Sequence, residues 1–128
     1  MIYVDTSVVL ARLLKEERSP PDAFWSQPLV SSRLLEYEVF NRLHLHTTDP
    51  ARIEIARLLV DRVSFYDMTA KILARALEPF AVAVRTLDSL HLATMVFLRA
   101  NGQTIRLATY DARLAAAAQA LGFELAAL

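Results

Sequence analysis

Four acidic residues lie where an enzyme would need carboxylates. Asp5 ends an apolar run that starts at the first residue, and Asp111 lies two residues after a second, largely apolar run, 105–109. Asp88 lies at the start of an apolar helical segment, and Glu38 lies about two turns into another. Clustered carboxylates raise one another's pKa and destabilise a fold unless a cation relieves the repulsion. Oxygen ligands, in a chain without cysteine, favour Mg²⁺ or Mn²⁺ over Zn²⁺.

The chemistry of such a carboxylate cluster is predictable. Mg²⁺ and Mn²⁺ bind substrate phosphates, activate a water molecule as nucleophile and stabilise the charge on the leaving oxygen. Hydrolysis of a phosphodiester bond is the reaction that this favours. The chain has no Walker A loop, Rossmann glycine pattern, nucleophile elbow or HExxH motif. Nucleotide-driven, NAD-linked, serine-hydrolase and zincin reactions therefore lack their usual residues.

Each aspartate also has a structural interpretation. Asp5, Asp88 and Asp111 all lie where a helix is expected to begin, and aspartate at that position commonly caps free N–H groups. At Asp5 this explanation is the weakest, because Thr6 and Ser7 already offer a cap. A charge at the end of an apolar strand is then redundant for structure, which favours a functional role for Asp5.

Glu38 has a competitor in the same helix, Glu36. Residues two apart lie about 200° apart around a helix, so the two carboxylates cannot share a face. Glu38 could pair with Arg42 at i, i+4 on an exposed face. Its neighbours Leu34 and Leu35, at i−4 and i−3, indicate a largely apolar surrounding instead.

Short apolar runs alternate along the chain with longer segments of helical spacing. We expect strands at 1–4, 29–30, 65–68, 105–109 and 123–125. We expect helices at 8–14, 22–25, 34–43, 50–63, 70–78, 87–100 and 112–121. This alternation predicts an α/β fold with a central parallel sheet flanked by helices on both faces. Because parallel strands share the edge at which they end, Asp5 and Asp111 should point to the same place.

Local signals set several helix ends. Ser31 or Ser32 is expected to cap the helix 34–43, whose many apolar positions indicate that it is substantially buried. Thr48-Asp49-Pro50 is a helix start signal, and Gly102 suits a left-handed cap after residue 100. The apolar segment 80–84 is compatible with helix or loop.

Length and composition bound the class of protein. A chain of 128 residues, 55% of them hydrophobic, suits one domain over residues 1–128. Without cysteine it has neither disulfides nor a thiolate metal site. It has no signal peptide and no apolar stretch of the roughly 18–20 residues that span a bilayer, so we expect a soluble, cytoplasmic protein. A formal net charge of zero neither indicates nor excludes nucleic-acid binding.

The chain resembles the PIN-domain family, and the VapC toxins in particular. The matching segments are VDTSVV around Asp5, SSRLLEYEVFNRL around Glu38, LDSLHLATM around Asp88 and ATYDARLAAAAQALGF around Asp111. The four segments occur in the family's order and spacing, and together they span nearly the whole chain. The spacing of the second segment selects Glu38 over Glu36.

The resemblance implies a fold, an activity and partners. It implies a parallel sheet flanked by helices, one or two Mg²⁺ or Mn²⁺ ions in an acidic pocket, and endonucleolytic cleavage of RNA. It also implies a homodimer and a neutralising, VapB-like antitoxin. The family's catalytic and metal-binding acids match Asp5, Glu38, Asp88 and Asp111. Thr6 and Thr109 match small polar positions, where a hydroxyl could hold a metal-bound water or a phosphate.

Other interpretations stay open. The fold could serve as a binding module that docks a partner, or as a nuclease of RNA processing that is not a toxin. His91 lies one helical turn after Asp88, and we expect it to be structural, although it could orient Asp88 or touch substrate. His44 and His46 fall on different faces of a helix, which argues against a zinc site there.

Overall fold

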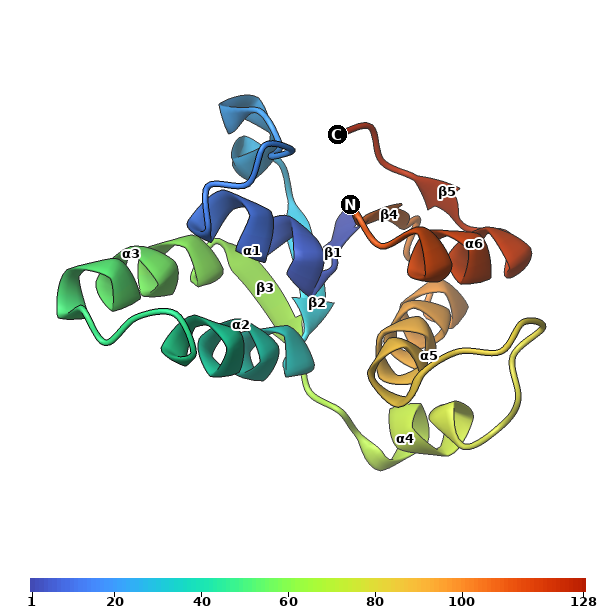
Figure 1. Ribbon diagram of the computed structural model, residues 1–128. Helices are drawn as coiled ribbons and strands as arrows, with labels where there is room; N and C mark the ends of the chain where they lie inside the picture. The colour runs from blue at the N-terminus through green and yellow to red at the C-terminus, as the bar shows by residue number, and fades with distance from the viewer.

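Five short strands form one parallel sheet in the computed structural model, which describes residues 1–128. In chain order the strands are β1 (Ile2–Val4), β2 (Leu29–Ser32), β3 (Val63–Tyr66), β4 (Arg106–Ala108) and β5 (Glu124–Leu125). The helices are α1 (Thr6–Leu13), the 3-10 helix η1 (Asp22–Ser26), α2 (Leu34–His44), α3 (Pro50–Val60), α4 (Ala70–Ala76), α5 (Thr86–Ala100) and α6 (Ala112–Ala120). The order across the sheet is β3-β2-β1-β4-β5, with every neighbouring pair parallel (Figure 1). The predicted α/β fold is confirmed.

Two hydrophobic cores cover the two faces of the sheet. Successive side chains of a strand point to opposite faces, so Ile2 and Val4 pack with α1, η1 and α2, while Tyr3 packs with α5 and α6. Figure 1 shows the same division, with α1, α2 and α3 on one side of the sheet and α5 and α6 on the other. Each fully buried side chain, such as Leu35 or Leu92, contributes about 1.5–3 kcal/mol to folding.

The start of α1 differs from the sequence-based expectation. The helix begins at Thr6 rather than Val8, and Asp5 is its N-cap, with the side chain accepting from the Ser7 N–H. Thr6 and Ser7 lie inside the helix and therefore do not cap it. The tight strand-to-helix connection after β1 leaves Asp5 as the only residue with the extended backbone that a cap requires.

The region around β2 also differs. Ser31 and Ser32 belong to the strand, where both are fully buried, although the Ser32 hydroxyl still accepts the N–H of Leu34 at 3.1 Å. The helix α2 is not buried all round, because Tyr37 is 67% exposed. Val63, expected in a helix, begins β3 because α3 ends at Val60.

Other predicted helix ends are confirmed. Asp49 caps α3 with Pro50 in its first turn, and Asp111 caps α6. Gly102 follows α5 with φ +86°, a backbone conformation that glycine adopts without strain. The segment 80–84 is a loop.

The order of the strands sets the place of a functional site. From β1 the chain moves outward to β2 and β3, then returns through α4 and α5 to place β4 on the other side of β1. The sheet thus reverses its winding between β1 and β4. In open parallel sheets, ligands bind outside the carboxyl ends of the strands at such a reversal. None of the helices is both long and apolar enough to cross a membrane.

Candidate active site

A cavity of about 600 Å³ opens at the carboxyl ends of β1 and β4. Its walls contain all four acids predicted from the sequence: Asp5, Glu38, Asp88 and Asp111. They come from four separate elements that meet only in the folded chain. A larger groove of about 810 Å³ between α1, α2 and α3 contains no acidic residue. The carboxylates, rather than the volume, therefore identify the candidate site.

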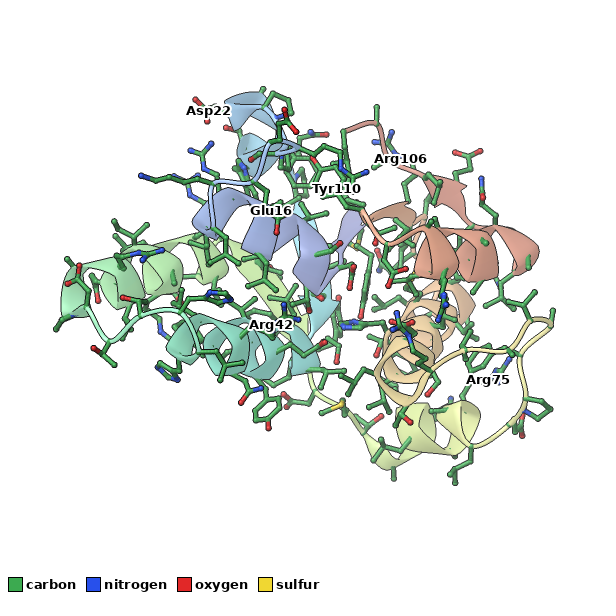
Figure 2. The ribbon with its side chains drawn as sticks, viewed as in Figure 1. Glu16, Asp22, Arg42, Arg75, Arg106 and Tyr110 are labelled. Atoms are coloured by element: carbon green, nitrogen blue, oxygen red, sulfur yellow. The ribbon has the colours of Figure 1, made fainter.

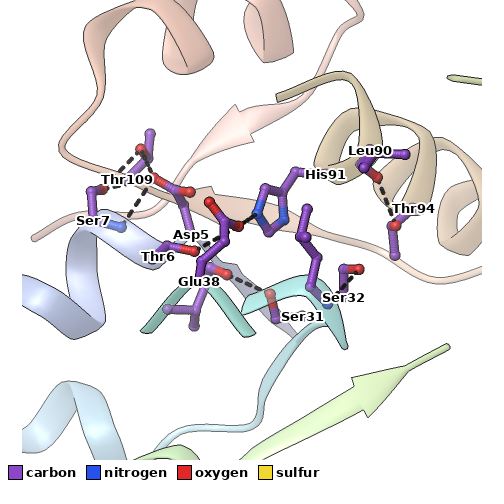
Figure 3. Close-up of polar contacts among 12 residues, drawn as sticks. Asp5, Thr6, Ser7, Ser31, Ser32, Glu38, Leu90, His91, Thr94 and Thr109 are labelled. Carbon is purple, nitrogen blue, oxygen red and sulfur yellow. Dashed lines mark hydrogen bonds and ion pairs between the residues drawn. The ribbon is translucent and has the colours of Figure 1, made fainter. Parts of the chain in front are cut away.

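Asp5 is held by hydroxyl groups on one side only. Its Oδ2 accepts the hydroxyls of Ser7 at 2.7 Å and Thr109 at 2.8 Å (Figure 3). The Ser7 oxygen in turn accepts the N–H of Tyr110 at 3.0 Å, and the Thr109 oxygen accepts that of Asp111 at 2.9 Å. All hydrogen bonds of the Asp5 carboxylate fall on Oδ2, so Oδ1 has no partner in the protein. One oxygen orients the carboxylate and the other is free for a ligand.

Glu38 is held in the same one-sided way. Its Oε1 accepts the hydroxyl of Thr6 at 3.0 Å and contacts Nε2 of His91 at 2.7 Å (Figure 3). Nδ1 of His91 lies 2.7 Å from the hydroxyl of Tyr3. Burial raises the pKa of the Tyr3 hydroxyl, because the phenolate is poorly solvated there. Oε2 of Glu38 has no partner in the protein, so it is free for a ligand.

Asp88 lies in the first turn of α5, and its side chain is only 15% exposed. Burial raises the pKa of its carboxyl, and the nearby charges of Asp111 and Asp5 raise it further. Arg85 and His91 act in the opposite direction. Asp88 is therefore close enough to Asp111 and Asp5 to be repelled by both, which a bound cation would relieve.

Asp111 combines two functions. Its Oδ1 caps α6 by accepting the N–H groups of Arg113 at 2.9 Å and Leu114 at 3.3 Å. Its Oδ2 faces Nη2 of Arg85 at 3.3 Å. A cap that uses one oxygen leaves the second available, so capping and a role in the site are compatible.

Glu36 points away from the cavity. It pairs with Arg57 at 2.8 Å on the outer surface of α2 and α3. Glu38 forms no ion pair with Arg42, which lines the cavity separately. Arg42 and Tyr110, together with Glu16, lie around the opening and come from different parts of the chain (Figure 2). Arg18 stacks on the ring of Tyr110, with its Cζ 5.0 Å from the ring centre.

Comparison with known proteins agrees with this geometry. The family model of the PIN domain matches residues 2–120. The chain belongs to the PIN-domain family. Two relatives named Ribonuclease VapC35, from the CDC 1551 / Oshkosh and ATCC 25618 / H37Rv strains of Mycobacterium tuberculosis, are each 28% identical to it over 132 residues. The matches cover 99% of this chain and 96% of each relative.

The predicted resemblance to VapC-type PIN proteins is confirmed by these matches. Both relatives are named as ribonucleases, which agrees with the predicted class of enzyme. The four acids are distant in sequence because they belong to different parts of the fold: Asp5 and Asp111 cap α1 and α6, Glu38 lies within α2, and Asp88 lies in the first turn of α5.

The carboxylates of this PIN domain suit a hard divalent cation in donor type. They supply only oxygen ligands, and Asp5 and Glu38 each keep an oxygen without a protein partner. As the side chains lie, no three acidic or histidine residues form a group close enough to hold one metal ion. Binding by three or more of them therefore requires some side chains to turn into the cavity.

Sequence reasoning missed parts of this arrangement. Thr6 and Thr109, expected beside a metal-bound water or phosphate, donate their hydroxyls to Glu38 and Asp5. His91 contacts Glu38 and not Asp88. The one-turn spacing of Asp88 and His91 placed the histidine on the correct helix face, but nothing in the sequence pointed to Tyr3.

Proposed function

We propose that this PIN domain, acting as a single unit over residues 1–128, is an endoribonuclease that hydrolyses RNA with Mg²⁺ or Mn²⁺. The observation that carries the proposal is the meeting of four carboxylates, from four separate elements, in one cavity at the reversal of the sheet. The names of the two relatives support RNA as the substrate.

The proposed ligands of the metal are Asp5, Glu38, Asp88 and Asp111. When bound, the metal would activate a water molecule and stabilise the charge of the leaving oxygen. Asp5 and Glu38 are each fixed by hydrogen bonds to one carboxylate oxygen. Their carboxylates are therefore already oriented, and the other oxygen of each is free to bind the metal. Around the opening, Arg18 and Arg42 supply guanidinium groups suited to RNA phosphates.

We further propose that the protein is the toxin of a VapBC-type pair. Its partners would be a VapB-like antitoxin and a second copy of the chain in a homodimer. A toxin that cleaves RNA acts in the cytoplasm, where we expect this protein. Induced expression should arrest growth, and co-expression of a small protein encoded by the neighbouring gene should restore it. Normal growth with active enzyme would favour an RNA-processing nuclease instead.

Cleavage of RNA with and without metal tests the activity directly. We expect cleavage with Mg²⁺ or Mn²⁺, loss of cleavage with EDTA, and loss in Asp5→Asn. Asp61→Asn, which changes an exposed aspartate at the end of α3, is the matched control and should cleave normally. Cleavage that persists in EDTA or in Asp5→Asn would contradict the mechanism. Binding of RNA or partner without turnover across many RNAs would favour the binding-module interpretation.

A further inference from the structure

We propose that Tyr3 and His91 are positioning residues that hold the Glu38 carboxylate in the orientation in which one oxygen is free for the metal. This role rests on the proposed function, because it concerns a carboxylate of the same site. Tyr3 and His91 are 0% and 1% exposed, so neither touches solvent or substrate. They act through Glu38, whose side chain is 16% exposed and lines the cavity.

Two of the hydrogen bonds have a direction fixed by chemistry. The backbone N–H of Ser32 can only donate, and it donates to the Tyr3 oxygen at 3.1 Å. A carboxylate can only accept, so Nε2 of His91 donates to Oε1 of Glu38 at 2.7 Å. Between these two bonds, the Tyr3 hydroxyl lies 2.7 Å from Nδ1 of His91.

The hydrogen bonds therefore form one unbroken series from the backbone of β2 to the carboxylate. The Ser32 N–H orients the Tyr3 hydroxyl, which contacts the imidazole of His91, and the imidazole in turn orients Glu38 (Figure 3).

The fold holds this series of bonds rigidly. Tyr3 reaches α5 because alternate residues of β1 point to the face that α5 covers. The Tyr3 and His91 rings meet edge to face, with centres 5.8 Å apart and planes at 82°. Displacement of either side chain would break a buried hydrogen bond, which is unfavourable because the freed groups are out of reach of water.

The hydrogen bonds that start at Tyr3 and His91 end on Oε1 of Glu38, whereas Oε2 has no partner in the protein. Thr6, from the other side of the sheet, donates to the same Oε1 at 3.0 Å. Two donors on Oε1 hold the carboxylate in one orientation, which leaves Oε2 without a protein partner and free for a ligand. Such partners of a metal ligand usually change metal affinity by about 10- to 100-fold when they are removed.

Binding of Mn²⁺ alone, followed by electron paramagnetic resonance of the free ion, tests the role without any assay of cleavage. We expect His91→Leu to weaken Mn²⁺ binding by about 10- to 100-fold. His91→Gln should retain most of the affinity, because its amide N–H can still donate to Glu38. Tyr3→Phe should weaken binding less than His91→Leu. Tyr37→Phe and His44→Leu change an exposed tyrosine and histidine of α2 and should bind normally.

A spectroscopic measurement gives an independent readout. In the metal-free protein labelled with ¹⁵N-histidine, we expect His91 to carry a proton on Nε2, the nitrogen that faces Glu38. Melting curves of the variants identify any that fail to fold. His91→Gln and Tyr3→Phe both substitute side chains of similar size, so at least one should stay folded for the comparison.

The outcomes are distinct. Equal Mn²⁺ affinity in folded His91→Leu and His91→Gln, or the absence of a proton on Nε2 in the unchanged protein, would overturn the positioning role and leave the nuclease proposal intact. Failure of the unchanged protein to bind Mn²⁺ at all would overturn both.

Discussion

Arg85 pairs with Asp111 across the candidate active site, with Nη2 of the guanidinium 3.3 Å from Oδ2 of the carboxylate. Nε of the same side chain lies 3.6 Å from Oδ2 of Asp88. A cation that belongs to the protein therefore lies between two of the proposed metal ligands. Any metal ion that Asp88 and Asp111 bind together must compete with it.

Removal of this competitor should strengthen metal binding. We expect Arg85→Ala to bind Mn²⁺ about two- to fivefold more tightly at low salt, a modest effect because Arg85 is 64% exposed and such pairs are weak. Titration with Mn²⁺ measures it. The control is Arg106→Ala, an exposed arginine at the amino end of β4. Weaker Mn²⁺ binding in Arg85→Ala would contradict the competition.

Two substitutions of Asp111 should distinguish its contribution to folding stability, as the cap of α6, from the contribution of its charge to RNA cleavage. Asp111→Asn keeps an oxygen for the N–H groups of Arg113 and Leu114, so unfolding in urea should change little while RNA cleavage is lost. Asp111→Ala should lose cleavage and also about 0.5–2 kcal/mol of folding stability. Equal stability of the two variants would show that the cap contributes nothing.

The hydroxyl of Thr109, rather than its methyl group, should hold the Asp5 carboxylate in the orientation needed for RNA cleavage. Thr109→Val keeps the shape but removes the donor to Asp5 and the acceptor for the Asp111 N–H. We expect cleavage to fall about tenfold or more in Thr109→Val, because the carboxylate then loses one of the bonds that orient it. Thr109→Ser keeps the hydroxyl and serves as the control. Kinetics of cleavage under saturating metal compare the two, and equal rates would refute the role of the hydroxyl.

Metal binding should stabilise the folded chain. A ligand that binds only the native state raises stability by RT ln(1 + [L]/Kd), about 2.7 kcal/mol at 100 times Kd. Millimolar Mn²⁺ should therefore raise the melting temperature by several degrees, and Glu38→Gln should abolish most of this rise. Glu54→Gln, an exposed glutamate of α3, should behave like the unchanged protein. A melting temperature insensitive to Mn²⁺ would count against the site.

Much of the architecture was predictable from local sequence. Apolar runs bounded by Asp49-Pro50 and Gly102 identify helices and strands, because capping and backbone restrictions act over a few residues. The same local signals placed Asp5 and Asp111 at the ends of strands. They failed around Ser31, which lies in a strand and not at a helix start, since burial in the middle of the sheet outweighs its capping tendency.

By itself the sequence determined that the chain is an α/β domain with Asp5, Asp88 and Asp111 near the ends of elements and Glu38 within a helix, because periodicity and caps are properties of neighbouring residues. Only the tertiary structure decided how those acids are held. The contacts of Glu38 with His91, of His91 with Tyr3, and of Thr109 with Asp5 join residues 53, 88 and 104 positions apart. Such contacts depend on which strands pair and which helix covers which face, and no local pattern encodes that.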